Sequence, residues 1–432
     1  MQTHFSLEQL QDPVLADANG ILRACVHCGF CTATCPTYVL LGDELDSPRG
    51  RIYLIKQMLE ENRPATESDA KHIDRCLSCL SCMTTCPSGV NYMHLIDTAR
   101  VHVEETFDRP GPERMLRNLL AAVMPRPGLF RHLMSAAGLA KPFAPLFERL
   151  GLKRIAAALA LTPLSLPREM TGRPGHYPAE GVEKGKAVLL RGCVQSVLDP
   201  GINAATIRLL NRFGWSVTVT EGESCCGSLP HHMGKEDAAL AYARRTIDQW
   251  TAENPDVIVI TSSGCGTTIK DYGHMFRLDP VYAEKAKAVA AKARDISELL
   301  AMLDLPEGKG GLRVTYHSAC SLQHGQQLKT GPQALLRRAG FEVTDVPEAQ
   351  ICCGSAGTYN ILQPDISQRL RDRKLANIAS TDPQVIAAGN LGCMTQLAQK
   401  SGVPVVHTVE LLDWAYGGPP PPQLDQAKTN AH

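Results

Sequence analysis

Two short runs of cysteines near the N-terminus constrain this chain more than any other feature. Each run has the spacing C-x2-C-x2-C-x3-C and is followed directly by proline. The first quartet comprises Cys25, Cys28, Cys31 and Cys35, and the second quartet comprises Cys76, Cys79, Cys82 and Cys86. Steps of three residues let one loop direct three thiols at a single centre. The fourth cysteine, fixed by the proline after it, is expected to begin a helix that leads away.

This spacing is the one by which bacterial-type ferredoxins hold [4Fe-4S] clusters, and the fourth cysteine of each run then serves the other cluster. We therefore predict two [4Fe-4S] clusters with crossed ligands. One cluster is assigned to Cys25, Cys28, Cys31 and Cys86, and the other to Cys76, Cys79, Cys82 and Cys35. Zinc is the alternative, but a closed zinc site usually takes its four ligands as two separated pairs, which fits two crowded quartets poorly.

Length and composition narrow the class of protein. A chain of 432 residues is expected to hold two to four domains. Its 44 basic and 44 acidic residues cancel, so nothing indicates a nucleic-acid partner. The N-terminus lacks the basic and apolar regions of a secretory signal, and sixteen cysteines without such a signal favour metal or redox chemistry in the reducing cytoplasm. The longest apolar run, 155–161, is far short of the roughly 20 residues that span a bilayer, so any membrane role is expected to be peripheral.

Residues 1–108 are predicted to form a helical domain around the two quartets. A short helical lead-in ends near residue 24, and a helix follows in which Ser47 is the N-cap and Pro48 the first residue. Arg49 and Arg51 at its start have two interpretations: they raise the potential of a nearby cluster, or they are solvated surface residues, which we favour from sequence.

Residues 109–184 are rich in proline between short helical stretches, which predicts a helical connector followed by a flexible linker. Basic amphipathic pieces within 129–161 suit a membrane surface or another subunit, and packing on their own neighbours is the equal alternative.

Beyond residue 185, apolar runs alternate with amphipathic helices, which predicts parallel sheets with crossover helices. Expected strands at 186–193, 215–220 and 256–265 are followed by a second set at 313–320, 341–346 and 384–393. The cysteines repeat with the strands at offsets of 127 or 128 residues: Cys193, Cys225, Cys226 and Cys265, then Cys320, Cys352, Cys353 and Cys393. We predict a tandem repeat of one α/β domain, at 185–305 and 306–432.

In each repeat the cysteines are expected at strand ends or in the loops that follow, where parallel sheets bind ligands. Converging thiols suit a soft metal or redox chemistry, and buried core cysteines are the alternative. Histidines and a tyrosine lie near these cysteines, either as proton carriers or as solvated loop residues: His231, His232, Tyr316, His317 and His324. No G-x-G-x-x-G or P-loop fingerprint is present in the sequence, so no flavin or nucleotide site is expected in this chain.

These motifs resemble a known family. The segments ILRACVHCGFCTATCPTY and SPRGRIYLIK, with the paired blocks CCGSLP/SGCG and CCGSAGTY/LGC, are similar to the iron-sulfur subunit of bacterial glycolate oxidase (glycolate dehydrogenase). Related proteins are the anchor subunit of anaerobic glycerol-3-phosphate dehydrogenase, the iron-sulfur lactate-utilisation protein and the heterodisulfide reductase subunit with CCG domains. The resemblance implies an α+β multidomain protein, with a helical two-cluster ferredoxin-type domain before two CCG α/β domains.

The resemblance also implies partners and cofactors. FAD-containing flavoprotein subunits would oxidise glycolate to glyoxylate, with no catalytic residue in this chain, and this subunit would carry the electrons to an acceptor such as a quinone. In heterodisulfide reductase, CCG domains hold noncubane [4Fe-4S] clusters in a site of five cysteines at its fullest, whereas each CCG set here has four. Alternatives are a disulfide or related sulfur reductase acting at the CCG cysteines, an iron-sulfur subunit for lactate or glycerol-3-phosphate, and a redox-sensing scaffold.

Overall fold

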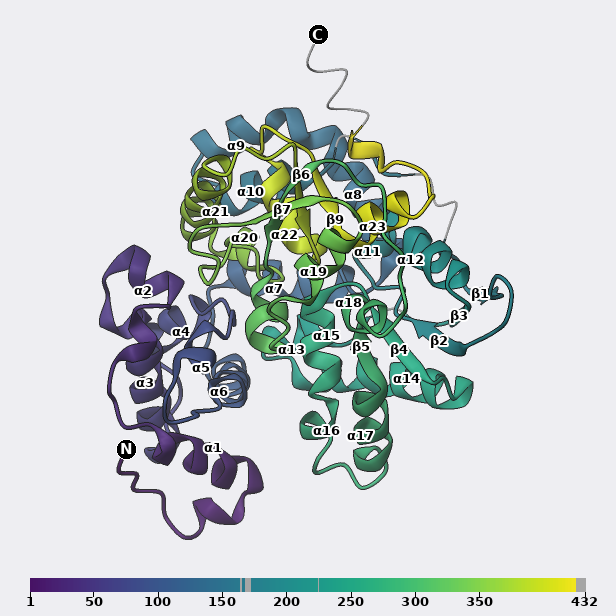
Figure 1. Cartoon of the computed structure of the whole chain (residues 1–432). Helices are drawn as coiled ribbons and strands as arrows, with labels where there is room; N and C mark the ends of the chain where they lie inside the picture. Colours follow the sequence, from purple (N-terminus) through teal and green to yellow (C-terminus); the bar gives the residue numbers. More distant parts are fainter. Residues whose placement is uncertain (164, 168–171, 224, 425–432) are drawn as a thin grey trace.

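The computed structural model describes residues 1–163, 165–167, 172–223 and 225–424. A helical N-terminal region, in purple and blue, lies beside two α/β domains in teal, green and yellow (Figure 1). Residues between them form a helical connector. This arrangement confirms the predicted α+β fold, with helices around the cysteine quartets and parallel sheets in the C-terminal part.

Six helices build the N-terminal region: α1 (Pro13–Ala24), α2 (Pro36–Leu41), α3 (Pro48–Glu60), α4 (Glu67–Asp74), α5 (Ser81–Thr85) and α6 (Tyr92–Thr106). Helix α3 begins as predicted, because the Ser47 side chain accepts a hydrogen bond from the Gly50 N–H and Pro48 takes the first helical position. The apolar faces of α1, α3 and α6 meet in a core that includes Leu22, Ile55 and Leu95, all fully buried.

The two cysteine–proline pairs lead into different structures. Pro36 starts α2 directly after Cys35, as predicted. The same expectation is wrong for the second quartet, because Pro87 lies in a turn and the next helix, α6, starts only at Tyr92, capped by Asn91. The second quartet therefore leaves its loop through a turn, and the asparagine cap supplies the helix start instead.

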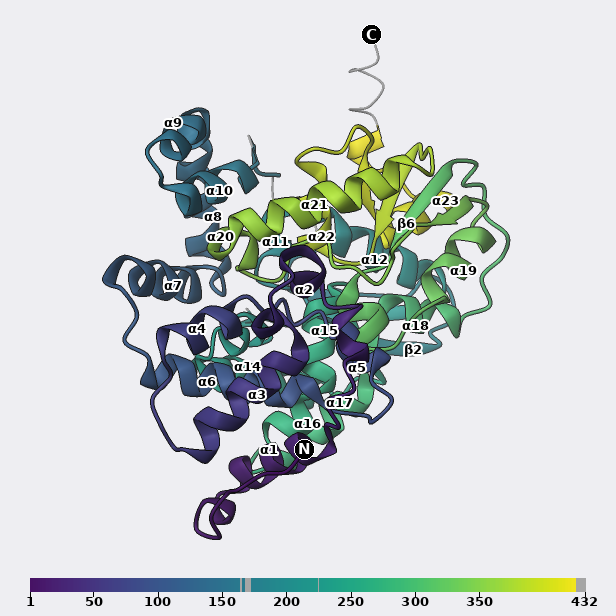
Figure 2. The ribbon, with the colours of Figure 1, turned by 90° about the vertical axis from the view of Figure 1, so that its left-hand side faces the viewer.

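The connector contains α7 (Gly111–Val123), α8 (Pro127–Ala140), α9 (Ala144–Arg149) and α10 (Lys153–Leu161). Helices α8 to α10, here called the arm, lie at the edge of the molecule beside α20 and α21 (Figure 2). Part of the predicted flexible linker, at 164 and 168–171, falls outside the described residues. The rest contains an unpredicted strand, β1 (Gly175–Tyr177), so the first sheet starts before the expected domain boundary at 185.

The first sheet has the strand order β1-β3-β2-β4-β5. Strands β2 (Gly185–Leu189), β3 (Trp215–Val219), β4 (Val257–Ile260) and β5 (Ala293–Asp295) are parallel, and β1 runs antiparallel at the edge. The helices of this domain are α11 (Gln195–Leu198), α12 (Gly201–Arg212), α13 (Ser228–His232), α14 (Glu236–Glu253), α15 (Ser263–Lys270), α16 (Tyr272–Met275), α17 (Ala283–Lys292) and α18 (Ile296–Ala301).

The second sheet has the order β7-β6-β8-β9 and is parallel throughout. Its strands are β6 (Arg313–His317), β7 (Glu342–Asp345), β8 (Val385–Ala388) and β9 (Val405–His407). Its helices are α19 (Gly331–Arg338), α20 (Tyr359–Leu362), α21 (Pro364–Ala379), α22 (Leu391–Ala398) and α23 (Thr408–Ala415), and a short π-helical turn covers Ser321–Gly325. The order matches that of β3-β2-β4-β5, which confirms the predicted repeat.

The two α/β domains share one hydrophobic core. Helix α12 of the first domain packs on α23 of the second, and α18 of the first packs on α19 of the second. Buried residues from both sheets, such as Leu189 and Val406, belong to the same apolar cluster. Arg208 of α12 also pairs with the fully buried Asp413 of α23, at 2.6 Å. Each domain therefore completes the core on one face of the other, whereas the opposite face of the first sheet has a cluster of its own.

The N-terminal region docks on both α/β domains through buried contacts. Leu77 and Cys79 pack with Ile351, Cys352 and Tyr359 of the second domain. The Tyr359 hydroxyl donates to the carbonyl of Arg75 at 3.0 Å. No helix among the described residues is long and apolar enough to cross a membrane.

Candidate iron-sulfur and thiol sites

The two N-terminal quartets line two neighbouring cavities in the crossed combination that the spacing predicts. The first cavity, of about 430 Å³ and partly open to solvent, is lined by Cys25, Cys28, Cys31 and Cys86 together with Cys82. The second, of about 310 Å³, is lined by Cys35, Cys76, Cys79 and Cys82. We call them the outer site and the inner site. The assignment of four ligands to each remains a prediction, with Cys82 at the wall between them.

The loops of both quartets have the same backbone conformation. In the first loop, His27 and Gly29 have φ angles of 56° and 86°, and in the second, Ser78 and Leu80 have 46° and 61°. These are the equivalent positions, on either side of the second cysteine. Left-handed residues there turn the chain so that its cysteines face one centre. An added Cβ at Gly29 would lie 2.8 Å from Nη1 of Arg49, so the end of that side chain would have to move.

The two sites differ in exposure. Cys28 of the outer site is exposed, and Cys31 and Cys86 are partly so. All four cysteines of the inner site are buried, at 6–8 % exposure. Burial raises the pKa of Cys79 and Cys82 well above the ordinary thiol value. Four thiolates packed this closely need a bound cation to offset their charge, which fits an iron-sulfur cluster.

Arg51 corrects the interpretation that we favoured from sequence. It is 1 % exposed and donates to the His72 carbonyl at 2.7 Å and to Thr37 Oγ1 at 3.1 Å. Its Nη1 lies 3.9 Å from the Cys35 sulfur, so a buried positive charge borders the inner site. Asp46, fully buried, pairs with Arg51 and holds it in place. Arg49 stays half-exposed and pairs with Glu44 at 2.7 Å.

The first CCG set converges as predicted. Cys193 contacts Cys225, Cys225 contacts Cys226, and Cys226 contacts Cys265, so the four sulfurs form a continuous group. Hydrogen bonds from Cys193 and Cys226 lower the pKa of Cys225 well below its ordinary value. The Gly227 N–H also donates to the Cys225 sulfur, at 3.4 Å. This set suits a soft metal or thiol redox chemistry.

The second CCG set has the same order. Cys320 and Cys352 have their sulfurs 3.8 Å apart, and contacts continue from Cys352 to Cys353 and Cys393. One expectation is wrong in both sets: Cys265 and Cys393 lie within the first turns of α15 and α22, not at a strand end. The segments that we expected to continue as strands instead begin helices, at Ser263 and at Leu391.

Two of the nearby histidines and the tyrosine are buried, so the solvated-loop interpretation is wrong for these three residues. His317 and His324 are 2 % and 8 % exposed, and Tyr316 is 1 % exposed. Burial lowers the pKa of His317 to about 3, so its imidazole is neutral. His231 Nε2 lies 3.2 Å from Asp97 Oδ2 and His232 Nδ1 lies 3.5 Å from Asp97 Oδ1, across the contact between α13 and α6.

The inner site lies directly against the second CCG set. Cys79 and Cys352 belong to one apolar cluster, and Cys320 packs at its edge. Cys79 is also close enough to Cys320 and Cys352 for their charges to raise one another's pKa. The sequence carries no signal for this contact, because it joins segments from different domains.

Comparison with known proteins places these sites in context. A family model for a 4Fe-4S dicluster domain matches residues 21–90, and a model for a cysteine-rich domain matches 187–270 and 314–398. The chain is 43% identical over 420 residues to the glycolate oxidase iron-sulfur subunit of Escherichia coli, covering 96% of this chain and 99% of that protein. It is 30% identical to the probable glycolate oxidase iron-sulfur subunit of Bacillus subtilis, again over 96% of this chain and 99% of that one.

A partial match is also informative. Lactate utilization protein A of Bacillus licheniformis is 29% identical over 237 residues, which is 53% of this chain and 99% of that protein. The full-length matches, the dicluster domain and the two cysteine-rich domains agree with the thiol-lined sites described above. The chain is an iron-sulfur oxidoreductase subunit, and it belongs to the family of glycolate oxidase iron-sulfur subunits.

Proposed function

We propose that this chain is the electron-transfer subunit of a glycolate oxidase complex. FAD-containing partner subunits oxidise glycolate to glyoxylate, and electrons leave through this chain toward a quinone. Iron-sulfur clusters, when bound, supply one-electron transfer. The residues of this chain would bind the clusters one after another along a path, set the charge around each cluster and contact the partner subunits.

The observation that carries this proposal is the unbroken series of thiol sites. The series begins at the exposed Cys28 of the outer site and passes through the wall at Cys82 to the buried inner site. It continues where Cys79 packs against Cys352. A series that runs from surface to interior between domains suits electron relay, whereas clusters with a purely structural role need no such order.

The outer site has a surface suited to a flavoprotein partner. Val26 and Phe30 flank Cys28 and are 66% and 62% exposed. Apolar side chains this exposed beside a cysteine-lined cavity provide a small docking surface. We place the entry of electrons here, because Cys28 is the exposed member of the four outer-site cysteines assigned by spacing.

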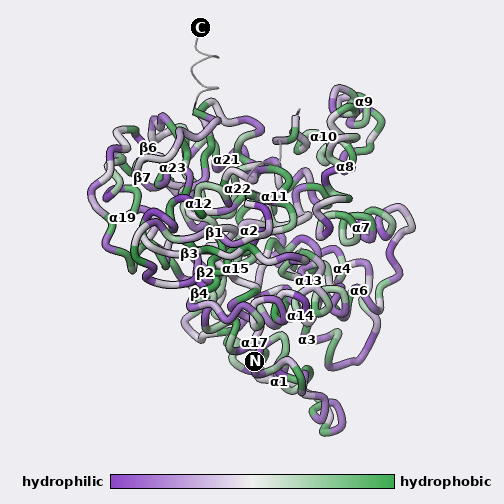
Figure 3. Tube along the Cα trace, turned by 90° about the vertical axis from the view of Figure 1, so that its right-hand side faces the viewer, coloured by the Kyte–Doolittle hydropathy of each residue, from purple (hydrophilic) through white to green (hydrophobic). Residues whose placement is uncertain are grey.

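The arm provides a surface for peripheral membrane contact. Residues 126–155 contain six lysines and arginines and one acidic residue, in a chain whose total charge is zero. Seven large apolar side chains in the same segment are exposed: Leu129, Leu139, Phe143, Leu146, Leu150, Leu152 and Ile155. Figure 3 shows hydrophobic positions in green along these outlying helices. Basic and apolar side chains together suit an anionic lipid surface.

Sedimentation with lipid vesicles tests this surface. The purified chain is expected to bind vesicles that contain phosphatidylglycerol, and to bind pure phosphatidylcholine vesicles several-fold less. Leu146→Glu with Leu150→Glu should remove binding, whereas Leu278→Glu with Met302→Glu, at exposed apolar residues elsewhere, should leave it unchanged. Retained binding by the arm variant assigns the arm to a protein partner instead.

The relay is tested in the assembled complex with partner flavoproteins. Under anaerobic conditions, glycolate should reduce the ferredoxin-type clusters in wild type and in a Cys353→Ala variant alike. Quinone reduction should fall at least tenfold in Cys353→Ala, and less in the matched variant Cys225→Ala of the first CCG set. Loss of glycolate-dependent cluster reduction in Cys353→Ala would contradict the proposed order. Loss of a disulfide-dependent activity in both variants would favour the sulfur-reductase alternative.

A further inference from the structure

The two CCG sites differ at a position that the repeat makes directly comparable. Leu190 and His317 are equivalent, because they are separated by the same 127 residues as Cys193 and Cys320. The strand pairing agrees with this: Leu189 pairs with Val259 in the first sheet, and Tyr316 pairs with Ala387 in the second. Leu190 is buried in an apolar cluster with Ile260 and Cys226. The second domain thus places an imidazole where the first has only hydrocarbon.

The environment of His317 leaves one ring nitrogen without a partner. Its Nε2 is buried and makes no hydrogen bond to any described residue. A buried polar atom without a partner has a cost in folding free energy. The neighbouring cation, Lys374, does not offset this cost, because its Nζ donates to the carbonyl of Glu348 at 2.8 Å.

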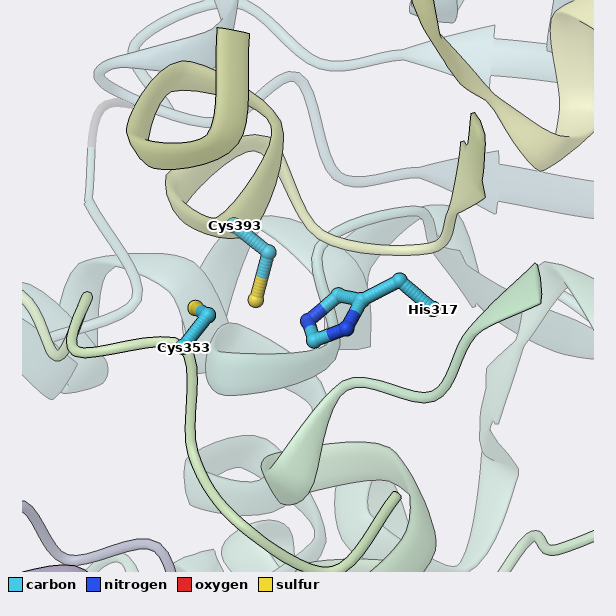
Figure 4. Close-up of side chains that lie close together, drawn as sticks. All are labelled: His317, Cys353 and Cys393. Atoms are coloured by element: carbon cyan, nitrogen blue, oxygen red, sulfur yellow. The ribbon is translucent and has the colours of Figure 1, made fainter. Parts of the chain in front are cut away.

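The imidazole points instead toward two cysteines (Figure 4). The ligand atoms of His317, Cys353 and Cys393 all lie within 4.8 Å of one another, and all three residues are buried. They come from three separate elements: the end of β6, the loop of the second CCG motif and the first turn of α22. Cys352 and Cys320 extend this group of soft donors toward Cys79.

A neutral imidazole among thiolates changes what a metal site does. Imidazole donates a lone pair without adding negative charge, so iron bound by nitrogen and sulfur is easier to reduce than iron bound by sulfur alone. The second domain also has the buried Lys374 close to Cys353. Gly227 lies against Ala239 in the first domain, and Gly354 lies against Ser367 in the second, so Ala239 and Ser367 are equivalent. Lys374 follows Ser367 by seven positions, and the residue that follows Ala239 by seven positions is Thr246. Both differences make the second site the less negative one.

We propose that His317 is a metal ligand, and that the second CCG site binds an iron-sulfur centre through this imidazole together with its cysteine thiolates. Among the described residues of the first CCG site, the apolar Leu190 takes the place of this histidine beside the cysteines. As a deepening of the proposed relay, on which this part rests, the second site has the higher potential of the two and receives the electrons from the inner site.

The test uses the full-length chain, purified anaerobically and labelled with ¹⁵N-histidine. Pulsed EPR should detect a nitrogen directly bound to a paramagnetic iron centre, and the coupling should change with the isotope. The coupling should be lost in His317→Leu, which copies the residue of the first domain, and kept in His324→Leu, another buried histidine of the second domain. His317→Cys, which preserves a metal ligand, should keep the iron and lose the nitrogen coupling.

Several outcomes overturn the proposal. A centre in the second site without histidine coupling removes His317 as a ligand, and so does zinc as the only metal found there. Redox titration tests the electron part separately: the His317→Cys centre should be reduced at lower potential than wild type. An unchanged potential with loss of the nitrogen coupling would leave the ligand assignment standing and count against the relay.

Discussion

His231 Nε2 lies 3.2 Å from Asp97 Oδ2, and this contact joins the first CCG domain to the helix that comes after the second quartet. Asp97 is the i−3 partner of Arg100, which donates to the Cys76 carbonyl at 2.7 Å and to Ser78 Oγ at 2.6 Å. The polar contacts therefore run from the CCG domain to the backbone of the inner-site loop. A change of charge at His231 is therefore expected to alter how that loop packs against the CCG domain.

The docking of the N-terminal region should weaken as pH rises. Burial opposes protonation of His231, but the charge of Asp97 and its hydrogen bond together raise the pKa of His231 above the ordinary value, with Asp271 adding to the rise and Arg100 opposing it. Because the folded pKa is the higher one, this stabilisation is complete below the unfolded value near 6.5 and is lost as pH rises through the folded value.

Limited proteolysis between pH 6 and 9 measures this effect, and cleavage between the N-terminal region and the CCG domains should accelerate at the alkaline end. His231→Gln should flatten the pH dependence and cost about 1–2 kcal/mol of unfolding free energy at low pH. A variant with the wild-type pH profile would show that another group controls docking. His232 provides the control, because burial lowers its pKa.

Arg51→Met should destabilise the inner site more than the outer site. The substitution removes the buried partner of Asp46 and should cost about 3 kcal/mol, since a buried charge loses part of its compensation. It also removes a positive charge beside Cys35, so the midpoint potential of the inner-site cluster should fall. Arg49→Met is the matched control, because Arg49 is half-exposed and lines the outer cavity. Equal shifts of both clusters in both variants would contradict this assignment.

Crossed ligation predicts which cluster each fourth cysteine supports. Cys86→Ala should reduce iron and the EPR signal of the outer cluster, and Cys35→Ala those of the inner cluster. Iron analysis with EPR of the dithionite-reduced protein shows which cluster each variant has lost. If Cys35→Ala removed the outer cluster instead, each quartet would hold its own cluster.

Gly29→Ala should loosen the outer site. The added Cβ would meet Nη1 of Arg49 at 2.8 Å, at a φ of +86°. Strain at such a position costs of the order of 1–3 kcal/mol, and displacement of Arg49 adds to it. Gly42→Ala is the control, with a φ of +69° and nothing within 4 Å, so it carries the backbone cost alone. The rate of iron release to a chelator should rise in Gly29→Ala and change little in Gly42→Ala.

Much of the fold is predictable because its signals are local. The Ser47–Pro48 capping signal predicts the start of α3, and helical periodicity predicts α14 (Glu236–Glu253). The spacing of the CCG cysteines predicts the repeat. The edge strands β1, β5 and β9 are three residues each, too short for a periodic signal. The burial of Arg51 depends on Asp46 and His72, which reach it only after folding.

The same limit applies to the candidate sites. The spacing of each quartet predicts that its first three thiols surround one cavity, because the loop conformation is set within a few residues. Sequence does not reveal that Cys79 meets Cys352. It also does not reveal that Nε2 of His317 has no hydrogen-bond partner among the described residues, or that this imidazole lies beside two cysteines. Both depend on how whole domains pack.

The shared core of the CCG domains has the symmetry of a homodimer joined into one chain, since α12 packs on α23 while the corresponding α19 packs on α18. In a homodimer, each substitution changes both subunits at once. Within one chain, position 190 can be leucine while the equivalent position 317 is histidine. A single chain therefore allows two equivalent pockets to differ in chemistry without loss of the interface that stabilises both.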